Sequence, residues 1–174
     1  MRNNVLINII FFLFLIKNGF AESISIQSKN ITLDKNKEIS VFQNDVVIKT
    51  QNEGVIKSDF AEYNKLNGLI KLRGNIEATD NQQNKIETKI AEYDENKKIF
   101  KSIGPTTITT TEKYIIEGED IFFDNGKGFI LSEKNAVITD KEKNKIYLEN
   151  FEYLTQSNIF KSIGYIKIED IKNN

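Results

Sequence analysis

Apolar residues recur along this chain at a fixed spacing of thirty residues. From residue 25 onward the sequence divides without a gap into five rows: 25–54, 55–84, 85–114, 115–144 and 145–174. The hexapeptide IFKSIG stands in the same columns of two rows, at 99–104 and 159–164. A fixed period of this size predicts stacked supersecondary units, each too small to bury its own apolar side.

Four columns of the alignment are apolar in every row. The first holds Ile26, Ile56, Ile86, Ile116 and Ile146. The second holds Leu33, Tyr63, Tyr93, Phe123 and Tyr153. The third holds Ile39, Leu69, Ile99, Phe129 and Ile159. The fourth holds Ile48, Ala78, Ile108, Ile138 and Ile168. We expect the first three columns to line the interior of the protein.

Each row is predicted to be a β-hairpin. Segments such as NIEAT (75–79) alternate apolar and polar residues, and no row has the 3.6-residue spacing of a helix. Polar links such as NKLNG, DENKK and DNGKG separate the two arms and are typical of hairpin turns. The rows are therefore expected to form an antiparallel meander.

The alternation changes phase within each arm, which predicts that the hairpin is bent. Ile56, Ser58 and Phe60 share one phase, whereas Ala61 and Tyr63 take the other. Such a flip requires a bulge or a corner. Glycine at 74, 104 and 164 on the second arm is expected to lie opposite the small residue of the first arm, Ser58 facing Gly74. Folded hairpins would give an elongated all-β structure of two facing sheets, of jelly-roll type, about 10 Å apart.

The first 21 residues have the pattern of an export signal. MRNN is followed by a twelve-residue apolar run (5–16), and small residues stand at Gly19 and Ala21. A membrane-spanning helix needs roughly 20 apolar residues, so we expect cleavage after Ala21 and export to the periplasm. Residues 22–174 would then be one β domain, although a retained membrane anchor is the alternative.

Composition excludes several kinds of chemistry. The chain has no cysteine and no histidine, which rules out disulfides, thiolate or imidazole metal sites and nucleophile–histidine catalysis. A net charge of −1 with scattered lysines argues against nucleic-acid binding, which needs a clustered basic face. No metal and no cofactor is expected.

The series of hairpins resembles the OstA-like domain family, which includes the periplasmic lipopolysaccharide transport protein LptA, its relative LptC and the N-terminal part of the outer-membrane assembly protein LptD. The similar segments are IKSDFAEYNKLNGLIKLRGNIEATD (56–80) and IETKIAEYDENKKIFKSIG (86–104), and the resemblance extends over 24–170. It implies a non-catalytic module that shields the acyl chains of lipopolysaccharide between two β-sheets. It also implies partners: other OstA-like domains, joined head-to-tail by strand addition. The residue sequence of the last row is most similar to an LptD-type N-terminal domain. An LptA-like protein is the other possibility within the family.

Two readings outside this family stay open. The first is a purely structural extracytoplasmic β-repeat, such as an adhesin segment, with a closed, dry core. The second is an enzyme such as a carboxylate-dependent glycosidase, in which two carboxyl groups lie about 5 to 9 Å apart. Glu62, Glu92 and Glu152 recur at one column beside turns, which favours a solvated face rather than one catalytic site.

Overall fold

The computed structural model describes residues 24–51 and 54–171, and all its regular structure except one 3₁₀ residue is β. The signal-peptide prediction for residues 1–21 lies outside the described residues. The long strands are β3 (Ile39–Lys49), β4 (Val55–Asn64), β5 (Leu69–Thr79) and β6 (Lys85–Asp94). The N-terminal edge strands are β1 (Ser25–Gln27) and β2 (Asn30–Asp34). The remaining strands are β7 (Ile99–Ser102), β8 (Pro105–Thr109), β9 (Ile115–Glu119), β10 (Phe122–Asp124), β11 (Phe129–Ser132), β12 (Ala136–Thr139), β13 (Lys145–Leu148), β14 (Phe151–Leu154), β15 (Ile159–Lys161) and β16 (Ile166–Glu169).

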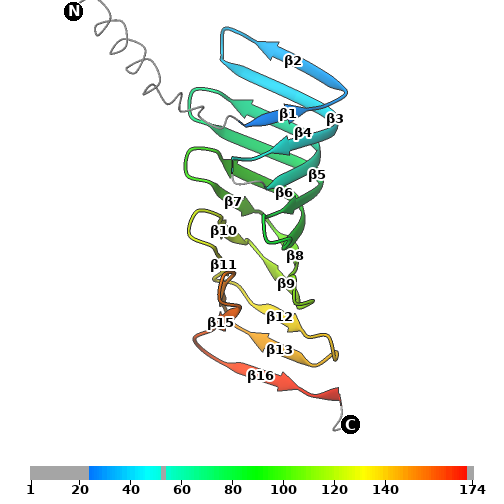
Figure 1. Ribbon diagram of the computed structural model, residues 1–174, viewed down its shortest axis with the longest axis vertical. Helices are drawn as coiled ribbons and strands as arrows, with labels where there is room; N and C mark the ends of the chain where they lie inside the picture. The colour runs from blue at the N-terminus through cyan, green and yellow to red at the C-terminus, as the bar shows by residue number, and fades with distance from the viewer. Residues whose placement is uncertain (1–23, 52–53, 172–174) are drawn as a thin grey trace, which may run out of the picture.

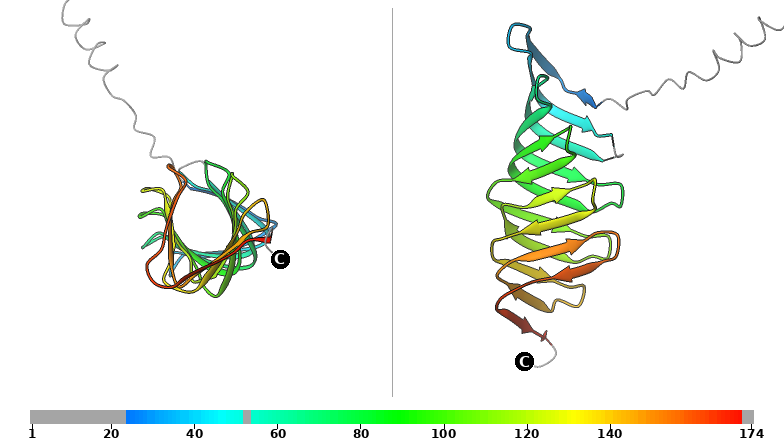
Figure 2. Two further views of the ribbon diagram at one scale, coloured as in Figure 1. Left: turned by 90° about the horizontal axis from the view of Figure 1, so that it is seen from below. Right: turned by 90° about the vertical axis from the view of Figure 1, so that its left-hand side faces the viewer.

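Every pairing is antiparallel, and the sixteen strands form one strongly curled sheet. From β6 the sheet divides into two branches, β7–β10–β11–β14–β15 and β8–β9–β12–β13–β16. We call these the first wing and the second wing. The long strands β3 to β6 belong to both wings, because each runs through the bend. Figures 1 and 2 show an elongated stack in which the wings curl around a common axis. The all-β fold with two facing layers is confirmed, with the difference that continuous strands join the layers into a single sheet.

The bend in each long strand is a β-bulge, as the change of phase predicted. The pairing register shifts between Gln43 and Val46, between Lys57 and Phe60, and between Arg73 and Ile76. Gly74 has a φ of 72°, a left-handed conformation that glycine adopts without steric cost. A Cβ atom at Gly74 would meet the carboxylate of Asp59, so Asp59 and not Ser58 is the residue that faces this glycine.

Beyond β6 the bend becomes a corner at which the strands are interrupted. Ser102 Oγ lies 2.7 Å from Thr106 Oγ1 and accepts a hydrogen bond of 2.9 Å from the backbone N–H of Ile121. Asp120 Oδ1 accepts a hydrogen bond of 2.8 Å from the N–H of Gly104. Small polar side chains thus satisfy backbone groups that the sheet ladder leaves unpaired at the corner.

The hairpin turns of the first wing share one geometry. The fourth turn residue has a positive φ in every row, between 52° and 69°, at Glu38, Gly68, Lys98, Gly128 and Asn158. An Asp or Asn opens four of the five turns, and its side chain accepts hydrogen bonds from turn N–H groups, as Asn64 does from Leu66 at 2.9 Å. These side chains favour a turn over continued strand. The turns therefore recur at thirty-residue intervals along one edge of the stack.

Candidate functional site

The interior of the curled sheet carries a continuous apolar row along the second wing. Ile48 pairs with Ile56, Ile56 with Ala78 and Ala78 with Ile86. The same register continues to both ends of the stack. In spatial order the row is Ile26, Ile48, Ile56, Ala78, Ile86, Ile108, Ile116, Ile138, Ile146 and Ile168.

A second interior row, rich in aromatic residues, follows the first wing. Tyr63 pairs with Ile70, Ile70 with Tyr93, and Tyr93 with Phe100. In spatial order this row is Leu33, Ser40, Tyr63, Ile70, Tyr93, Phe100, Phe123, Ile130, Tyr153 and Phe160. The two rows together make a lengthwise apolar interior formed by side chains from every row of the repeat.

The middle of this interior is closed and its ends are open. Ile108 and Ile116 are 0% exposed and Phe100 is 3% exposed. At the N-terminal end, Leu33 of β2 is 55% exposed, and at the C-terminal end Ile168 of β16 is 68% exposed. The end residues face the same way as the buried ones, but no further strand covers them.

The structure places ten of the fifteen predicted site residues on the inward-facing side of the sheet and five on the outside. The first column and the second column stand in the two interior rows. The third column does not: Ile39, Leu69, Ile99, Phe129 and Ile159 share the outer face of the first wing with charged residues. The prediction that these five residues point into the interior is wrong, because the inward-facing column lies one residue further along the chain. Ser40, Ile70, Phe100, Ile130 and Phe160, the next residues along, point inward instead.

The sequence analysis missed these inward residues because the third column and the column that follows it are both apolar in most rows. The signal that separates them lies two residues further on. Leu69 shares its phase with Lys71 and Arg73, whereas Ile70 shares its phase with the buried Leu72. Following the alternation as far as the charged residues would have identified the inner face.

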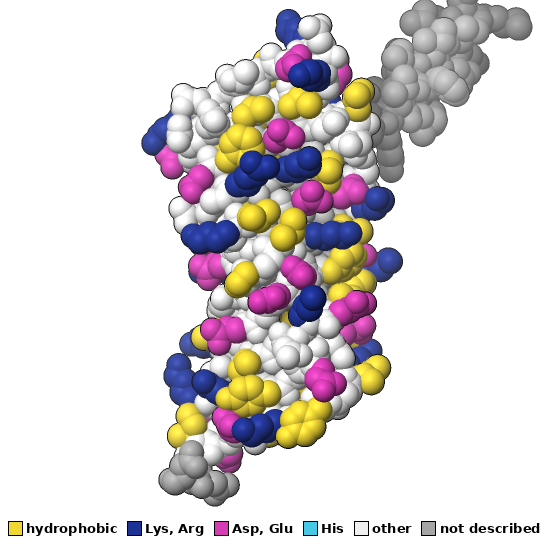
Figure 3. All heavy atoms as spheres, turned by 180° about the vertical axis from the view of Figure 1, so that it is seen from behind, with side chains coloured by type: hydrophobic (Ala, Val, Ile, Leu, Met, Phe, Trp, Pro, Cys, Tyr) yellow, Lys and Arg dark blue, Asp and Glu magenta, His cyan; other side chains and the backbone are white. Residues whose placement is uncertain are grey.

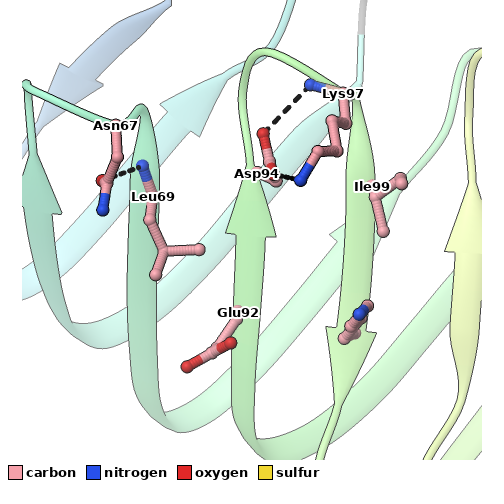
Figure 4. Close-up of a pocket in the computed structure, with 7 residues that line it drawn as sticks. Asn67, Leu69, Glu92, Asp94, Lys97 and Ile99 are labelled. Atoms are coloured by element: carbon pink, nitrogen blue, oxygen red, sulfur yellow. Dashed lines mark hydrogen bonds and ion pairs between the residues drawn. The ribbon is translucent and has the colours of Figure 1, made fainter.

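Two residues of the third column, Leu69 and Ile99, instead line a groove of about 350 Å³ on the outer surface (Figure 4). Its lining residues are Asn67, Leu69, Glu92, Asp94, Lys97, Ile99 and Lys101. Lys97 Nζ lies 3.1 Å from the Asp94 carboxylate, which also accepts a hydrogen bond from the Lys97 N–H at 3.0 Å. Five of the seven residues that line the groove are polar or charged, whereas the two interior rows are almost entirely apolar.

Tyrosine hydroxyl groups mark the edge of the interior on the first wing. Tyr63 donates a hydrogen bond of 2.7 Å to Glu95, and Tyr153 donates one of 2.8 Å to Asn158. Burial, followed by the interaction with Glu95, raises the pKa of Tyr63 to about 12. Burial, followed by the charge of Glu112, raises the pKa of Tyr153 to about 12. Both phenols stay neutral at physiological pH, so the rim of the interior is polar but uncharged at these positions.

The outer surface carries charges of both signs interspersed (Figure 3). The Glu62, Glu92 and Glu152 column lies on the outer face of the first wing, where Glu152 forms an ion pair of 3.3 Å with Lys161. The described residues include no group of three or more acidic side chains arranged to hold a metal ion. Within 24–51 and 54–171 there is also no helix with the length and apolar character needed to cross a membrane.

A family model described as "Lipopolysaccharide-assembly, LptC-related" matches residues 21–129, more than half of the chain. No curated protein matches. Among solved structures, the chain is similar to the crystal structure of LptH, the LptA homologous periplasmic component of the lipopolysaccharide transport device of Pseudomonas aeruginosa. That similarity has 13% sequence identity and a TM-score of 0.34, and covers 86% of this chain and 95% of the other.

Proposed function

The chain belongs to the LptC-related lipopolysaccharide-assembly family, and from this premise we propose that it is a non-catalytic module that carries lipopolysaccharide through the periplasm. The acyl chains bind between the two wings, and the sugars stay in water outside. The observation that carries this proposal is the pair of interior rows, because they provide apolar contact along the whole length of the stack.

The energetics favour an acyl ligand in such an interior. Burial of one methylene contributes about 0.8 kcal/mol, so a single acyl chain with a dozen methylenes in contact gains several kcal/mol. This gain must offset the apolar contacts between the two wings that are lost when lipid enters. Residues such as Ile108 and Ile116 make these contacts and are 0% exposed. Lipid replaces apolar contacts by other apolar contacts, so the exchange costs less than exposure of the same residues to water.

The open ends support a second part of the proposal, that like domains add head-to-tail. Edge strands with unpaired backbone groups accept a further strand. Continuation of the thirty-residue period predicts the register: Phe160 of β15 pairs with Leu33 of the next copy, and Ile168 of β16 pairs with Ile26. Both interior rows would then run on without a break from one copy to the next.

Site-specific photo-crosslinking tests the lipid site. A photoreactive residue at Ile70 or Tyr93 should capture lipopolysaccharide, because both positions point inward. Leu69 and Ile99 are the matched controls, since they lie on the outer face of the same strands or the next one. Equal capture at Leu69 and Ile70 would mean nonspecific adhesion to the surface and would contradict the proposal.

A purely structural repeat with a dry core is the second candidate, and the fully buried middle of the interior favours it. In that case none of the four photoreactive positions captures lipid. The result separates the two functions without any assumption about partners.

The gene neighbourhood tests which member of the family the chain resembles. An LptA-like bridge is supported if an ATPase gene lies near the coding frame, and an LptD-type N-terminal domain is supported if a barrel-coding frame follows directly downstream.

The proposal also includes export with cleavage after Ala21. The exported protein should then begin with Glu22, and intact-mass measurement of the periplasmic product checks this.

A further inference from the structure

Charges alternate from strand to strand along one line on the outer face of the first wing. Three rows of the repeat contribute a cross-strand pair of glutamate and lysine to it: Glu62 with Lys71, Glu92 with Lys101, and Glu152 with Lys161. Ladder partners on adjacent strands point to the same side of a sheet, so these side chains share one face. From β6 to β15 the line is Glu92, Lys101, Phe122, Leu131, Glu152 and Lys161. We call these six residues the outer column.

The fourth row of the repeat interrupts the charges with an apolar patch. Phe122 and Leu131 occupy the places of the glutamate and the lysine, and both are half-buried. The ring of Phe122 stacks on Phe129, with centroids 5.9 Å apart. Ile103, which is 50% exposed, lines a groove of about 620 Å³ together with Phe122 and Leu131. An exposed apolar patch with a charged rim is typical of an interaction site.

The outer column is complementary to its own reverse. A two-fold axis parallel to the strands, between β10 and β11, places the outer faces of two copies against each other with their stacks antiparallel. The facing pairs are then Lys101 with Glu152, Phe122 with Leu131, and Glu92 with Lys161. Each pair occurs twice because the contact is two-fold symmetric. Every position of the column therefore meets an opposite charge or an apolar side chain.

Other arrangements of the same two faces are less favourable. A two-fold axis along the stack sets each charge against the same charge, which is repulsive. If the antiparallel copy is displaced by two strands, Phe122 faces Lys101 and Leu131 faces Glu92, so apolar side chains oppose charges. The charges therefore select the antiparallel orientation, and the apolar pair selects the register.

We propose that two copies of this chain associate side by side through the outer column, in antiparallel orientation. The match of all six positions to the same six in reverse favours a second copy over an unrelated partner. This contact is separate from head-to-tail addition, which uses the ends of the stack, and it does not depend on lipid carriage. A two-fold contact closes at the dimer, whereas head-to-tail addition continues to longer multimers.

The lateral dimer is expected to be weak. Five strand spacings of about 4.8 Å make the outer column about 24 Å long, and the outer face of a curled sheet is convex, so the contact is narrow. Interfaces below the standard size are transient, and we expect a dissociation constant of about 0.1 mM at low salt. Salt screens exposed charges, so the dimer should weaken as ionic strength rises.

Charge reversal tests the pairing of Lys101 with Glu152. In Lys101→Glu the new carboxylate faces Glu152 of an identical copy, and in Glu152→Lys the new ammonium group faces Lys101. Each variant alone should lose about tenfold in dimer affinity. In a mixture of the two variants the mixed dimer has opposite charges at both contacts, so its affinity should return to within about threefold of the unmodified chain.

Sedimentation velocity measures the unmodified chain and the single variants, and fluorescence energy transfer between the two labelled variants measures the mixture. The matched controls are Glu62→Lys and Lys71→Glu, which lie on the same face but outside the overlap of the two copies. Neither control nor their mixture should change the lateral dimer. Head-to-tail addition contributes equally to every sample because the ends of the stack are unaltered. Far-ultraviolet circular dichroism verifies that each variant is folded.

A disulfide gives a structural measurement of the same contact, since the chain contains no cysteine of its own. The variant carries Lys101→Cys with Glu152→Cys. Three strand spacings, about 14 Å, separate these positions within one chain, which is too far for an internal disulfide. Mild oxidation should therefore give covalent dimers and no longer multimers, because each thiol of one copy meets a thiol of the other.

Three results would overturn the inference. The first is a single variant that associates as tightly as the unmodified chain, or a mixture that associates no better than either variant alone. The second is a ladder of long multimers from the two cysteines. The third is an unmodified chain without lateral dimers at about 1 mM, ten times the expected dissociation constant. None of these results bears on the capture of lipopolysaccharide by the interior.

Discussion

Leu69 and Ile70 are adjacent in β5, but their side chains lie on opposite faces of the curled sheet. Leu69 lines the outer groove, whereas Ile70 is 0% exposed and stands between Tyr63 and Tyr93 in the first-wing interior row. The two residues have nearly equal size and hydrophobicity. Differences between variants at these positions therefore report the face and not the residue type.

Truncation of these neighbours should have very different effects on stability. Ile70→Ala removes packed methyl groups and leaves a cavity, which is expected to cost about 2–5 kcal/mol of unfolding free energy. Leu69→Ala is expected to cost about 1 kcal/mol or less, because half-buried surface positions tolerate truncation. Urea unfolding followed by circular dichroism measures both. Similar losses at the two positions would contradict the assignment of the faces.

The bulge in β5 gives a second prediction. Gly74→Ala places a Cβ atom in a left-handed conformation and against Asp59, so we expect a loss of about 1–2 kcal/mol. Gly118→Ala is the control. Its added Cβ atom would make ordinary contacts of 3.5 Å with Ala136 and Ile121, and its φ is not positive. Equal midpoints of urea unfolding for the two variants would show that the bend does not depend on glycine.

Alkaline pH should destabilise the protein through its buried tyrosines. Burial raises the pKa of Tyr93 and Tyr153 from 10.0 to about 12, so the folded state favours the neutral phenols. This stabilisation is fully present below the ordinary tyrosine pKa and is lost as pH rises through about 12. Thermal unfolding midpoints should therefore fall above pH 10, and Tyr153→Phe should make that fall shallower. A fall of the same steepness in the variant would contradict the role of Tyr153.

Head-to-tail addition predicts a specific pairing between copies. In a chain carrying Leu33→Cys and Phe160→Cys, mild oxidation should produce a ladder of disulfide-linked multimers, because these positions would face each other in the continued first-wing row. The mismatched pair Leu33→Cys with Ile168→Cys places the thiols on different wings and should give few multimers. Denaturing gels without reductant measure the difference. Equal ladders from the two pairs would indicate random collision.

The row length, the hairpins and the bends were predictable because each leaves a local signal. Asn64, Asp94 and Asp124 open their turns through side-chain hydrogen bonds to nearby N–H groups, and Gly74 marks a bulge by its left-handed φ. Such features depend on residues close in sequence, so a thirty-residue alignment displays them.

The choice between Leu69 and Ile70 was not predictable from their own two columns, because both columns are apolar in most rows and only the alternation with Lys71 and Arg73 separates the two faces. The contact between the edges of the two wings was also hidden from the sequence. Tyr153 meets Glu112 through the curl of the whole sheet, and no local pattern records the angle of that curl. Continuity of the long strands through the bend has the same origin, because it depends on pairing between four successive strands.

The uniform thirty-residue displacement of every ladder pair has a consequence for the length of the protein. Ile48–Ile56, Ala78–Ile86, Ile108–Ile116 and Ile138–Ile146 are the same pairing repeated. Deletion or duplication of one whole row therefore preserves all remaining partners and alters only the distance that the interior spans. Gene changes in multiples of ninety nucleotides therefore lengthen or shorten the apolar interior while each inward side chain keeps its orientation.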